Sequence, residues 1–340
     1  MQPGVIQRIR QSLLEKRQNV SVWLETAPES EKECCLGEAP EAPVEAHLQV
    51  VNAALEKAED ETLGVCQVCH GQIEPGVLEI DYTASICLDC LSAPEKRRLE
   101  SELEFSTQVQ RALLPQEDPS IPGLEVAAFS RPAQYIGGDY FDFFRFRDGS
   151  QGLVIADVMG HGVSASLLMS SLQTALQTLA PDYDAAPELM RRINRFYLHN
   201  IKLTTFVTIF LGQFDPERRR LAYCNAGHNP PLLLRQAGGL PAWLGPTAAA
   251  VGLVEDYRVR AETVSLEPGD IVVLYTDGVT EAVNPSSEQL GRERLADLVA
   301  AHAQEPAREL LASLRQGLSD FLDGESLADD VTIVVCKVPG

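Results

Sequence analysis

The stretch from residue 151 to residue 162 reads QGLVIADVMGHG. A short apolar run bounded by glycines predicts a buried β-strand, and the glycines that follow predict a sharp turn. Asp157 stands at the end of this strand. We therefore expect the fold to present its carboxylate at the rim of a sheet.

Three further motifs place an acid at the end of a strand-like run: GGDYFD at 137–142, TDGV at 276–279 and DDVT at 329–332. Carboxylates gathered at one rim repel each other, by roughly 4 kcal/mol per pair at about 4 Å and an effective dielectric of about 20. Divalent cations remove this repulsion, and oxygen ligands select Mg²⁺ or Mn²⁺ over softer ions. Two such ions can activate one water for in-line attack on phosphorus, which needs no covalent nucleophile. The sequence has no Cys-x5-Arg loop, GxSxG elbow or Walker A motif that would favour another phosphoryl or acyl chemistry.

Strand-like runs follow one another from Leu124 onward, and helical patterns lie between groups of them. Such grouping favours an α+β layered domain over a regular βαβ alternation. The helices are expected near 164–180, 187–200, 291–303 and 306–322.

The first third of the chain has a different sequence pattern. Helical periodicity at 5–25 and at 46–62, separated by an acidic, proline-rich loop, indicates an antiparallel helical hairpin. A strongly charged helix begins at Pro94 and ends at Pro115. The predicted domains are therefore a hairpin with a cysteine module at 1–92, a connecting helix at 93–115 and the layered domain at 116–340.

Two CxxC pairs lie between the hairpin and the connecting helix, Cys66 with Cys69 and Cys87 with Cys90. Two such knuckles can surround a tetrahedral Zn²⁺, and four thiolates form a closed, structural site. The competing interpretation is four free or redox-active cysteines. His70 is interpreted as a surface residue, and the remaining cysteines as free thiols: Cys34, Cys35, Cys224 and Cys336.

Composition limits the setting of the protein. A formal net charge of −21 repels phosphate backbones, so a nucleic-acid partner is not expected. No apolar stretch approaches the roughly 20 residues of a membrane helix, and the N-terminus lacks the apolar core of a signal peptide. We therefore expect a cytoplasmic protein with no membrane segment, in which eight cysteines indicate metal or free thiols.

The segment ALEKAEDETLGVCQVCHGQIEPGVLEIDYTASICLDC resembles the DksA/TraR zinc-finger family over about residues 46–98. Members of that family act on RNA polymerase through the tip of a hairpin. The resemblance implies the fold of a finger with one structural zinc. It does not fix the partner, because the hairpin here is short and its tip is acidic.

From LLPQ at Leu113 to Val338 the chain resembles the PPM (type 2C) phosphatases, most closely the SpoIIE/RsbU branch. The motifs that carry the likeness are YIGGDYFD, IADVMGHGVSASLLM, TFVTIFLGQFD, CNAGHNPPLLL, GDIVVLYTDGVTEAVN and ADDVTIVV. The resemblance implies an α/β/β/α sandwich with two catalytic Mn²⁺ or Mg²⁺ ions at one end of its sheets. It also assigns the ligands, which are the carboxylates of Asp139, Asp157, Asp277 and Asp329 and the backbone carbonyl of Val158.

Other polar residues near the motifs have weaker assignments. Asp142 and Asp330 are interpreted as supporting acids, and Arg131 as a possible contact of the substrate phosphate or an ordinary surface residue. His161 either stabilises its turn or transfers a proton. Structural support is the preferred role of the NAGHNP turn residues Asn225, His228 and Asn229.

The resemblance implies a metal-dependent protein serine/threonine phosphatase, whose substrate in this branch is a phosphorylated STAS-type anti-anti-sigma factor. The alternative is a transcription-regulating protein that binds RNA polymerase through the finger, with the phosphatase domain as a scaffold. A homodimer through residues 95–114 is also expected, with Leu103 and Val109 in the seam. The competing interpretation of this helix is an inert spacer packed on its own domain.

Overall fold

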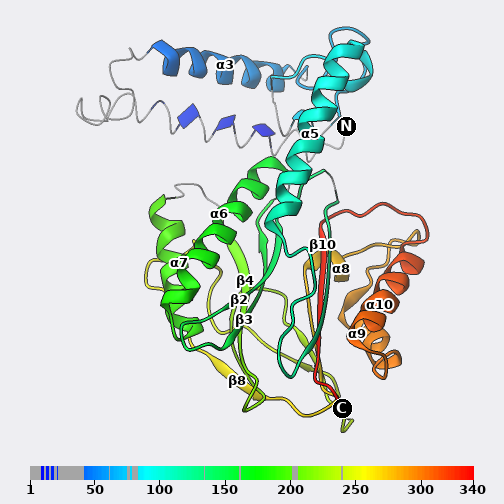
Figure 1. Cartoon of the computed structure of the whole chain (residues 1–340). Helices are drawn as coiled ribbons and strands as arrows, with labels where there is room; N and C mark the ends of the chain where they lie inside the picture. The colour runs from blue at the N-terminus through cyan, green and yellow to red at the C-terminus, as the bar shows by residue number, and fades with distance from the viewer. Residues whose placement is uncertain are drawn as a thin grey trace. The chain divides into compact units, whose positions relative to one another are not determined.

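Figure 1 shows a computed structural model of the 340-residue chain. The structure describes residues 9–10, 13–14, 17–18, 21, 42–60, 62–74, 77–78, 83–133, 135–160, 162–200, 206–238 and 240–340, with the backbone alone at 42–47, 99–100 and 200. His161, Cys34 and Cys35 lie outside the described residues. The described chain contains no helix with the length and apolar character that crossing a bilayer requires.

The larger part of the chain contains two five-stranded sheets whose neighbouring strands all run antiparallel. One sheet has the order β2-β3-β4-β5-β8, with strands Asp139–Arg145, Gln151–Val158, Val207–Asp215, Arg220–Ala226 and Glu262–Ser265. The other has the order β1-β10-β9-β6-β7, with strands Glu125–Arg131, Val331–Lys337, Ile271–Tyr275, Leu232–Leu234 and Ala242–Trp243.

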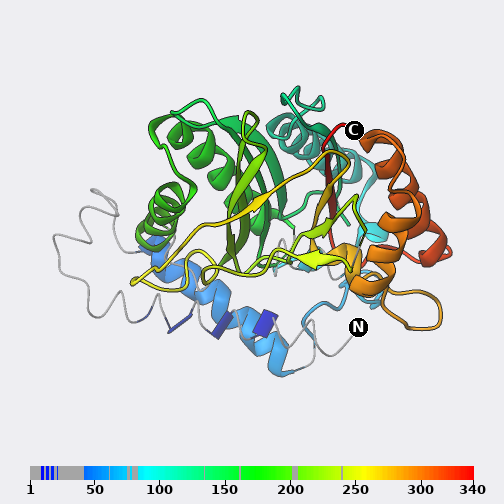
Figure 2. The ribbon, with the colours of Figure 1, turned by 90° about the horizontal axis from the view of Figure 1, so that it is seen from below.

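Three buried clusters define four layers. Side chains from the inner faces of both sheets, such as Phe141, Ile155 and Val334, form the cluster between them. Alternate residues of the first sheet pack on the outer side against α6 (Val163–Leu179) and α7 (Ala186–Asn200). Those of the second sheet pack against α9 (Gly291–Ala301) and α10 (Ala307–Leu322). This period of two is what a sheet buried on both faces requires. The result is a sandwich with helices on each outer face (Figures 1 and 2).

The helices of this part follow the sequence pattern closely. Their bounds are α6 Val163–Leu179, the 3₁₀ turn η2 Ala180–Asp182, α7 Ala186–Asn200, the short α8 Asp277–Thr280, α9 Gly291–Ala301 and α10 Ala307–Leu322. All four longer helices coincide with the predicted ranges to within about two residues. Their apolar stripes repeat at the helical period and meet the sheets, which is why the sequence marks them.

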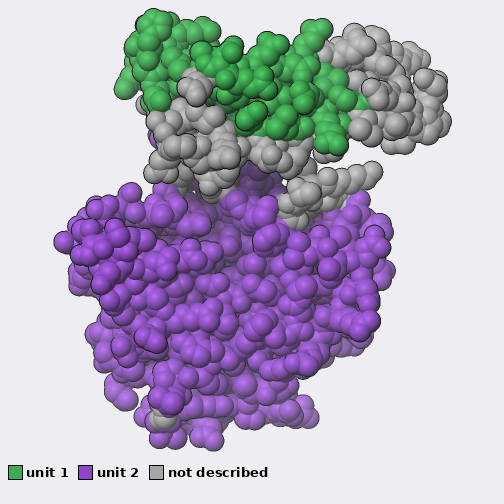
Figure 3. All heavy atoms as spheres, turned by 180° about the vertical axis from the view of Figure 1, so that it is seen from behind, with its two compact units in different colours: residues 1–102 green, residues 103–340 purple. Residues whose placement is uncertain are grey.

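The chain separates into two compact units, residues 1–102 and 103–340 (Figure 3). The first unit contains α3 (Ala42–Glu59) and the 3₁₀ turn η1 (Leu88–Cys90). Ile9 and Leu13 are buried in the same cluster as Val51 and Leu55 of α3 and Cys66. This small core lies next to the cysteine pairs.

The helix α5 (Ala93–Leu113) crosses the boundary between the two units. Within 103–113, Phe105 and Val109 are exposed, whereas Leu103 is half-buried. Leu103 and Val109, six residues apart, point about 120° apart around the helix, and the seam expected between two copies stays a prediction.

Candidate functional site

Asp139 and Asp157 face each other across two strands. Asp139 begins β2, Asp157 lies near the end of β3, and the two residues are direct partners in the antiparallel register. Their neighbours Phe141 and Ile155, two residues along each strand, point into the core between the sheets. The side-chain alternation of a strand therefore places both carboxylates on that inner face, at one end of the sandwich.

The second sheet holds Asp139 from the opposite side. Thr276, just after β9, and Thr332, in β10, each donate a hydroxyl hydrogen bond of 2.7 Å to Oδ2 of Asp139. Asp139 is only 5% exposed. The carboxylate therefore lies where the two sheets meet, and its orientation is fixed by three strands.

Asp277 and Asp329 lie at the same rim, next to the ends of two strands of the second sheet. Asp277 follows β9 as the first residue of α8, and Asp329 precedes β10, the strand paired with β9. The backbone at Gly278 lies in close contact with the backbone of 329–330. Four strands in two sheets thus bring together the four acids that the sequence motifs singled out.

The acids influence one another's protonation. Burial raises the pKa of Asp139 well above its usual range, and the charges of Asp157 and Asp330 raise it further. Burial, together with the charges of Asp277, Asp329 and Asp330, raises the pKa of Asp157 to about 8. Burial and Asp329 also raise the pKa of Asp277. No positive side chain of the described residues is among the main groups that shift the pKa values of Asp139, Asp157 and Asp277.

The donor set fits hard divalent cations. The four acids offer carboxylate oxygens, and the positive charge of a bound cation would remove their mutual repulsion. The carbonyl oxygen of Val158 lies close to Gly138, next to Asp139, since a β-carbon on Gly138 would be 2.9 Å from it. Its place among the ligands stays a prediction. The oxygen atoms of these carboxylates lie less close to one another than the sulfur atoms of the four cysteines in the first unit, which form a compact group.

Asp330 and Asp142 hold backbone and helices in place. The two carboxylate oxygens of Asp330 accept hydrogen bonds from the N–H groups of Ala133 (2.8 Å) and Gly138 (2.7 Å). Asp142 accepts bonds of 2.6 Å from the Tyr140 hydroxyl and from Gln177 of α6. These contacts agree with the supporting roles expected for both acids.

The NAGHNP turn also has a supporting role. Asn225 accepts the N–H of His228 at 2.9 Å and donates to the carbonyl of Leu244 at 3.0 Å. The Nδ1 of buried His228 lies 2.9 Å from the Thr208 hydroxyl, which in turn lies 3.3 Å from the Asp157 carbonyl oxygen. The turn thus packs behind the strand end that carries Asp157.

Arg131 lies on the same cavity as the acids. It is exposed at the end of β1, and a cavity of about 290 Å³ is lined by Arg131, Asp139 and Asp330 among others. An arginine in this place can reach an anionic group near the rim.

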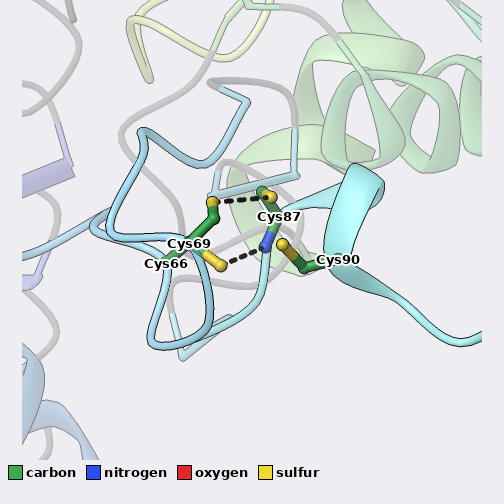
Figure 4. A group of neighbouring side chains, drawn as sticks. All are labelled: Cys66, Cys69, Cys87 and Cys90. Atoms are coloured by element: carbon green, nitrogen blue, oxygen red, sulfur yellow. Dashed lines mark hydrogen bonds between the residues drawn. The ribbon is translucent and has the colours of Figure 1, made fainter.

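The cysteine pairs form a separate compact group in the first unit (Figure 4). The sulfur atoms of Cys66, Cys69, Cys87 and Cys90 lie within 4.8 Å of one another. Backbone N–H groups point at the sulfurs: Val68 and Cys87 donate to Cys66 at 3.4 and 3.3 Å. These N–H groups favour a thiolate, and those of Cys69 and Cys87 lower the pKa of Cys66 to about 6.

This sulfur group fits Zn²⁺. Four sulfurs on two knuckles match the closed tetrahedral set of a structural zinc site, and N–H donors stabilise the thiolates that a zinc ion requires. The hydrogen bonds that Cys90 donates to Cys87 and Cys69 raise its pKa to about 12, so the metal-free group holds protons that zinc would displace. His70 is exposed, as expected for a residue outside the ligand set.

The family model of the stage II sporulation protein E (SpoIIE) matches residues 147–339, more than half of the chain. The chain belongs to the SpoIIE family. The phosphoserine phosphatase RsbU of Bacillus subtilis is 29% identical to it over 242 residues, 71% of either protein. This SpoIIE-family chain also shares 31% identity and a TM-score of 0.56 with the RsbU and RsbW domains of a Mycobacterium tuberculosis protein, covering 65% of this chain and 62% of that one.

The fold agrees with this membership. The SiaA-PP2C domain of Pseudomonas aeruginosa superimposes with a TM-score of 0.65 at 23% identity, covering 72% of this chain and 99% of that domain. The SpoIIE-family chain therefore has a PP2C-like fold with two antiparallel sheets and flanking helices. It is a protein serine/threonine phosphatase.

Three residues of the SpoIIE-family site were not recognised in the sequence. Thr276 and Thr332 lie inside the quoted motifs TDGV and DDVT, directly before one predicted ligand and three residues after another. Gln110 lies on α5, where its side chain contacts the backbone of Gly137. The threonines could have been found from their motifs, whereas no local signal marks Gln110.

Proposed function

We propose that this phosphatase hydrolyses phosphoserine or phosphothreonine on a regulatory protein with the help of two bound Mn²⁺ or Mg²⁺ ions. The observation that carries the proposal is the convergence of four carboxylates from both sheets on one rim, where burial and mutual repulsion raise the pKa of Asp157 to about 8. Such a site is costly to fold without a cation.

The chain's own groups have distinct tasks in this proposal. Asp139, Asp157, Asp277 and Asp329, with the carbonyl of Val158, hold the ions, which when bound activate a water for attack on phosphorus. Thr276 and Thr332 keep Asp139 in its orientation through their two hydrogen bonds. The exposed Arg131 pairs with oxygens of the substrate phosphoryl group and brings it to the rim.

A phosphorylated STAS-type protein is the proposed substrate. Support comes from the likeness to RsbU, which is itself named a phosphoserine phosphatase. The site is at a rim and Asp329 is exposed, so a phosphorylated side chain on the surface of another protein can reach it.

We further propose that the cysteine group binds one structural Zn²⁺ in a DksA/TraR-like finger and that the protein acts in the cytoplasm. The fit of four sulfurs and their N–H donors supports the zinc. The alternative of a scaffold that binds RNA polymerase through the finger loses support, because the four carboxylate positions are all filled and brought together.

The test is phosphate release from a phosphorylated STAS-domain protein and from p-nitrophenyl phosphate, with Mn²⁺, Mg²⁺ or chelator. We expect turnover only with metal, and a loss of at least about a hundredfold in Asp277→Asn. The exposed acid Asp297 on α9 offers a matched control, since Asp297→Asn should keep full activity. Robust turnover in chelator, or an active Asp277→Asn, would exclude the metal-dependent mechanism.

A further inference from the structure

We infer that Gln110 is a positioning residue for the carboxylate site, because it holds the segment that carries Asp139 in the arrangement that binds the divalent cations. This inference deepens the proposed function and rests on it. Gln110 lies near the C-terminal end of α5, within the second unit, and is half-buried.

One side chain satisfies both polar groups of a buried residue. The Nε2 of Gln110 donates to the carbonyl of Gly137 at 2.6 Å, and its Oε1 accepts the N–H of Gly137 at 3.1 Å. Gly137 is buried, two residues before Asp139. Buried backbone groups without partners are unfavourable, so the loss of Gln110 would drive this segment to rearrange.

The segment is held from its other side by Asp330. Its carboxylate accepts the N–H of Gly138 at 2.7 Å and that of Ala133 at 2.8 Å. A β-carbon on Gly137 would overlap this carboxylate. The loop between β1 and β2 therefore lies between Gln110 and Asp330, and its end fixes where Asp139 enters the site.

Hydrogen bonds from two residues of α5, Thr107 and Gln110, join it to this loop. The cavity of about 290 Å³ lies here, lined by Thr107 and Gln110 of α5 as well as by Gly137 and Asp139. The Thr107 hydroxyl lies 3.0 Å from the carbonyl oxygen of Tyr135, and 2.9 Å from that of Leu103, to which it can donate instead. Hydrogen bonds are directional, so this contact specifies position more strongly than an apolar contact of similar size.

The experiment compares three variants of the full-length, zinc-loaded chain. Gln110→Met keeps the length of the side chain and its helix propensity but removes both hydrogen bonds. Thr107→Val removes the hydroxyl of the neighbouring contact at nearly constant shape. Gln108→Met makes the same substitution at an exposed position of the same helix and serves as the matched control. The measurements are Mn²⁺ binding by titration calorimetry, the half-saturating Mn²⁺ concentration for p-nitrophenyl phosphate hydrolysis, and the melting temperature.

We expect Gln110→Met to weaken Mn²⁺ binding about tenfold and to raise the half-saturating Mn²⁺ concentration equally, with most of kcat recovered at saturating metal. Thr107→Val should shift both in the same direction by a smaller factor, and Gln108→Met should match the wild type. A lower melting temperature in Gln110→Met with unchanged Mn²⁺ binding would make Gln110 a structural contact only and overturn the inference. A wild type that binds no Mn²⁺ and hydrolyses nothing would instead overturn the proposed function, and the inference with it.

Discussion

Gly278 lies so close to Asp330 that a β-carbon on residue 278 would overlap the carbonyl oxygen of Asp330. The two residues directly follow Asp277 and Asp329, the two acids that the second sheet contributes to the site. The close backbone approach therefore sets the distance between two carboxylates that come from segments about fifty residues apart. Only glycine permits it.

Gly278→Ala should abolish most phosphatase activity by forcing these segments apart. We expect at least a tenfold loss of activity and a destabilisation of about 1–3 kcal/mol, because a methyl group has no space at this contact. Gly245→Ala is the matched control, since nothing lies within 4 Å of a β-carbon there. Urea unfolding and p-nitrophenyl phosphate turnover measure the two effects. A Gly278→Ala variant as active and as stable as Gly245→Ala would contradict the role given to this contact.

Asp157→Asn should stabilise the metal-free protein while removing its activity. The pKa of Asp157 is raised to about 8, so at pH 7 its charged form is unfavourable in the fold and favourable in the unfolded chain. A neutral amide relieves this, and we expect a gain of about 1–3 kcal/mol in chelator. With Mn²⁺ present the wild type should be more stable than Asp157→Asn, because only the wild type gains stability from binding the metal. Asp297→Asn, the same substitution at an exposed position, should change neither stability nor activity. Lower stability of Asp157→Asn in chelator would show that repulsion among the acids does not govern the stability of the metal-free site.

The layers of the fold and the acids of its rim were predictable from local patterns. The continuous apolar run before Asp157 indicates a strand buried on both faces, and the helical stripe of residues 307–322 indicates one buried face of a helix. The strand Glu262–Ser265 was missed because its side chains are mostly exposed and show no apolar alternation.

Contacts between distant segments were not predictable in this way. The bond between Gln110 and Gly137 joins residues 27 apart, and those from Thr276 and Thr332 to Asp139 span 137 and 193 residues. A glutamine on a charged helix and a threonine in a strand look ordinary in sequence. Their roles depend on where the sheets meet, which only the folded chain defines.

His228 should make the protein sensitive to mild acid. Burial lowers its pKa to about 3, whereas the unfolded chain takes up a proton near pH 6.5. The stability that neutral His228 contributes is therefore fully present above pH 6.5. It is lost as the pH falls toward 3, by about 2 kcal/mol at pH 5. His228→Gln should lower stability at pH 7 but flatten its decline between pH 7 and 5 in urea unfolding with chelator. His199→Gln, at an exposed site, should keep the wild-type slope. Equal slopes in wild type and His228→Gln would refute this assignment.

The finger should contain one zinc per chain. Cys66→Ser combined with Cys90→Ser removes one sulfur from each knuckle, so metal analysis should show that zinc is lost. Residues 46–98 should then unfold locally and become susceptible to proteolysis. The second unit has its own core and should keep its melting transition. Cys224→Ala with Cys336→Ala removes two buried thiols outside the group and should leave zinc content unchanged. Freshly reduced wild-type protein without zinc would refute the finger.

The exposed side of α5 offers a test of the expected homodimer. Phe105 is 66% exposed and Val109 is 46% exposed, one helical turn apart, whereas Thr107 and Gln110 bond to the domain from another side of the helix. Two large apolar side chains at this spacing form the start of a seam that a second copy can cover.

Phe105→Glu with Val109→Glu should therefore shift the chain from dimer to monomer in light scattering, because paired helices would bring four carboxylates together. The domain-facing bonds of Gln110 are untouched, so Mn²⁺ binding by the monomer should persist. Gln108→Glu adds charge at an exposed position beside the seam and should weaken the dimer less. A wild type that is monomeric at all concentrations would refute the seam and leave α5 as a spacer packed on its own domain.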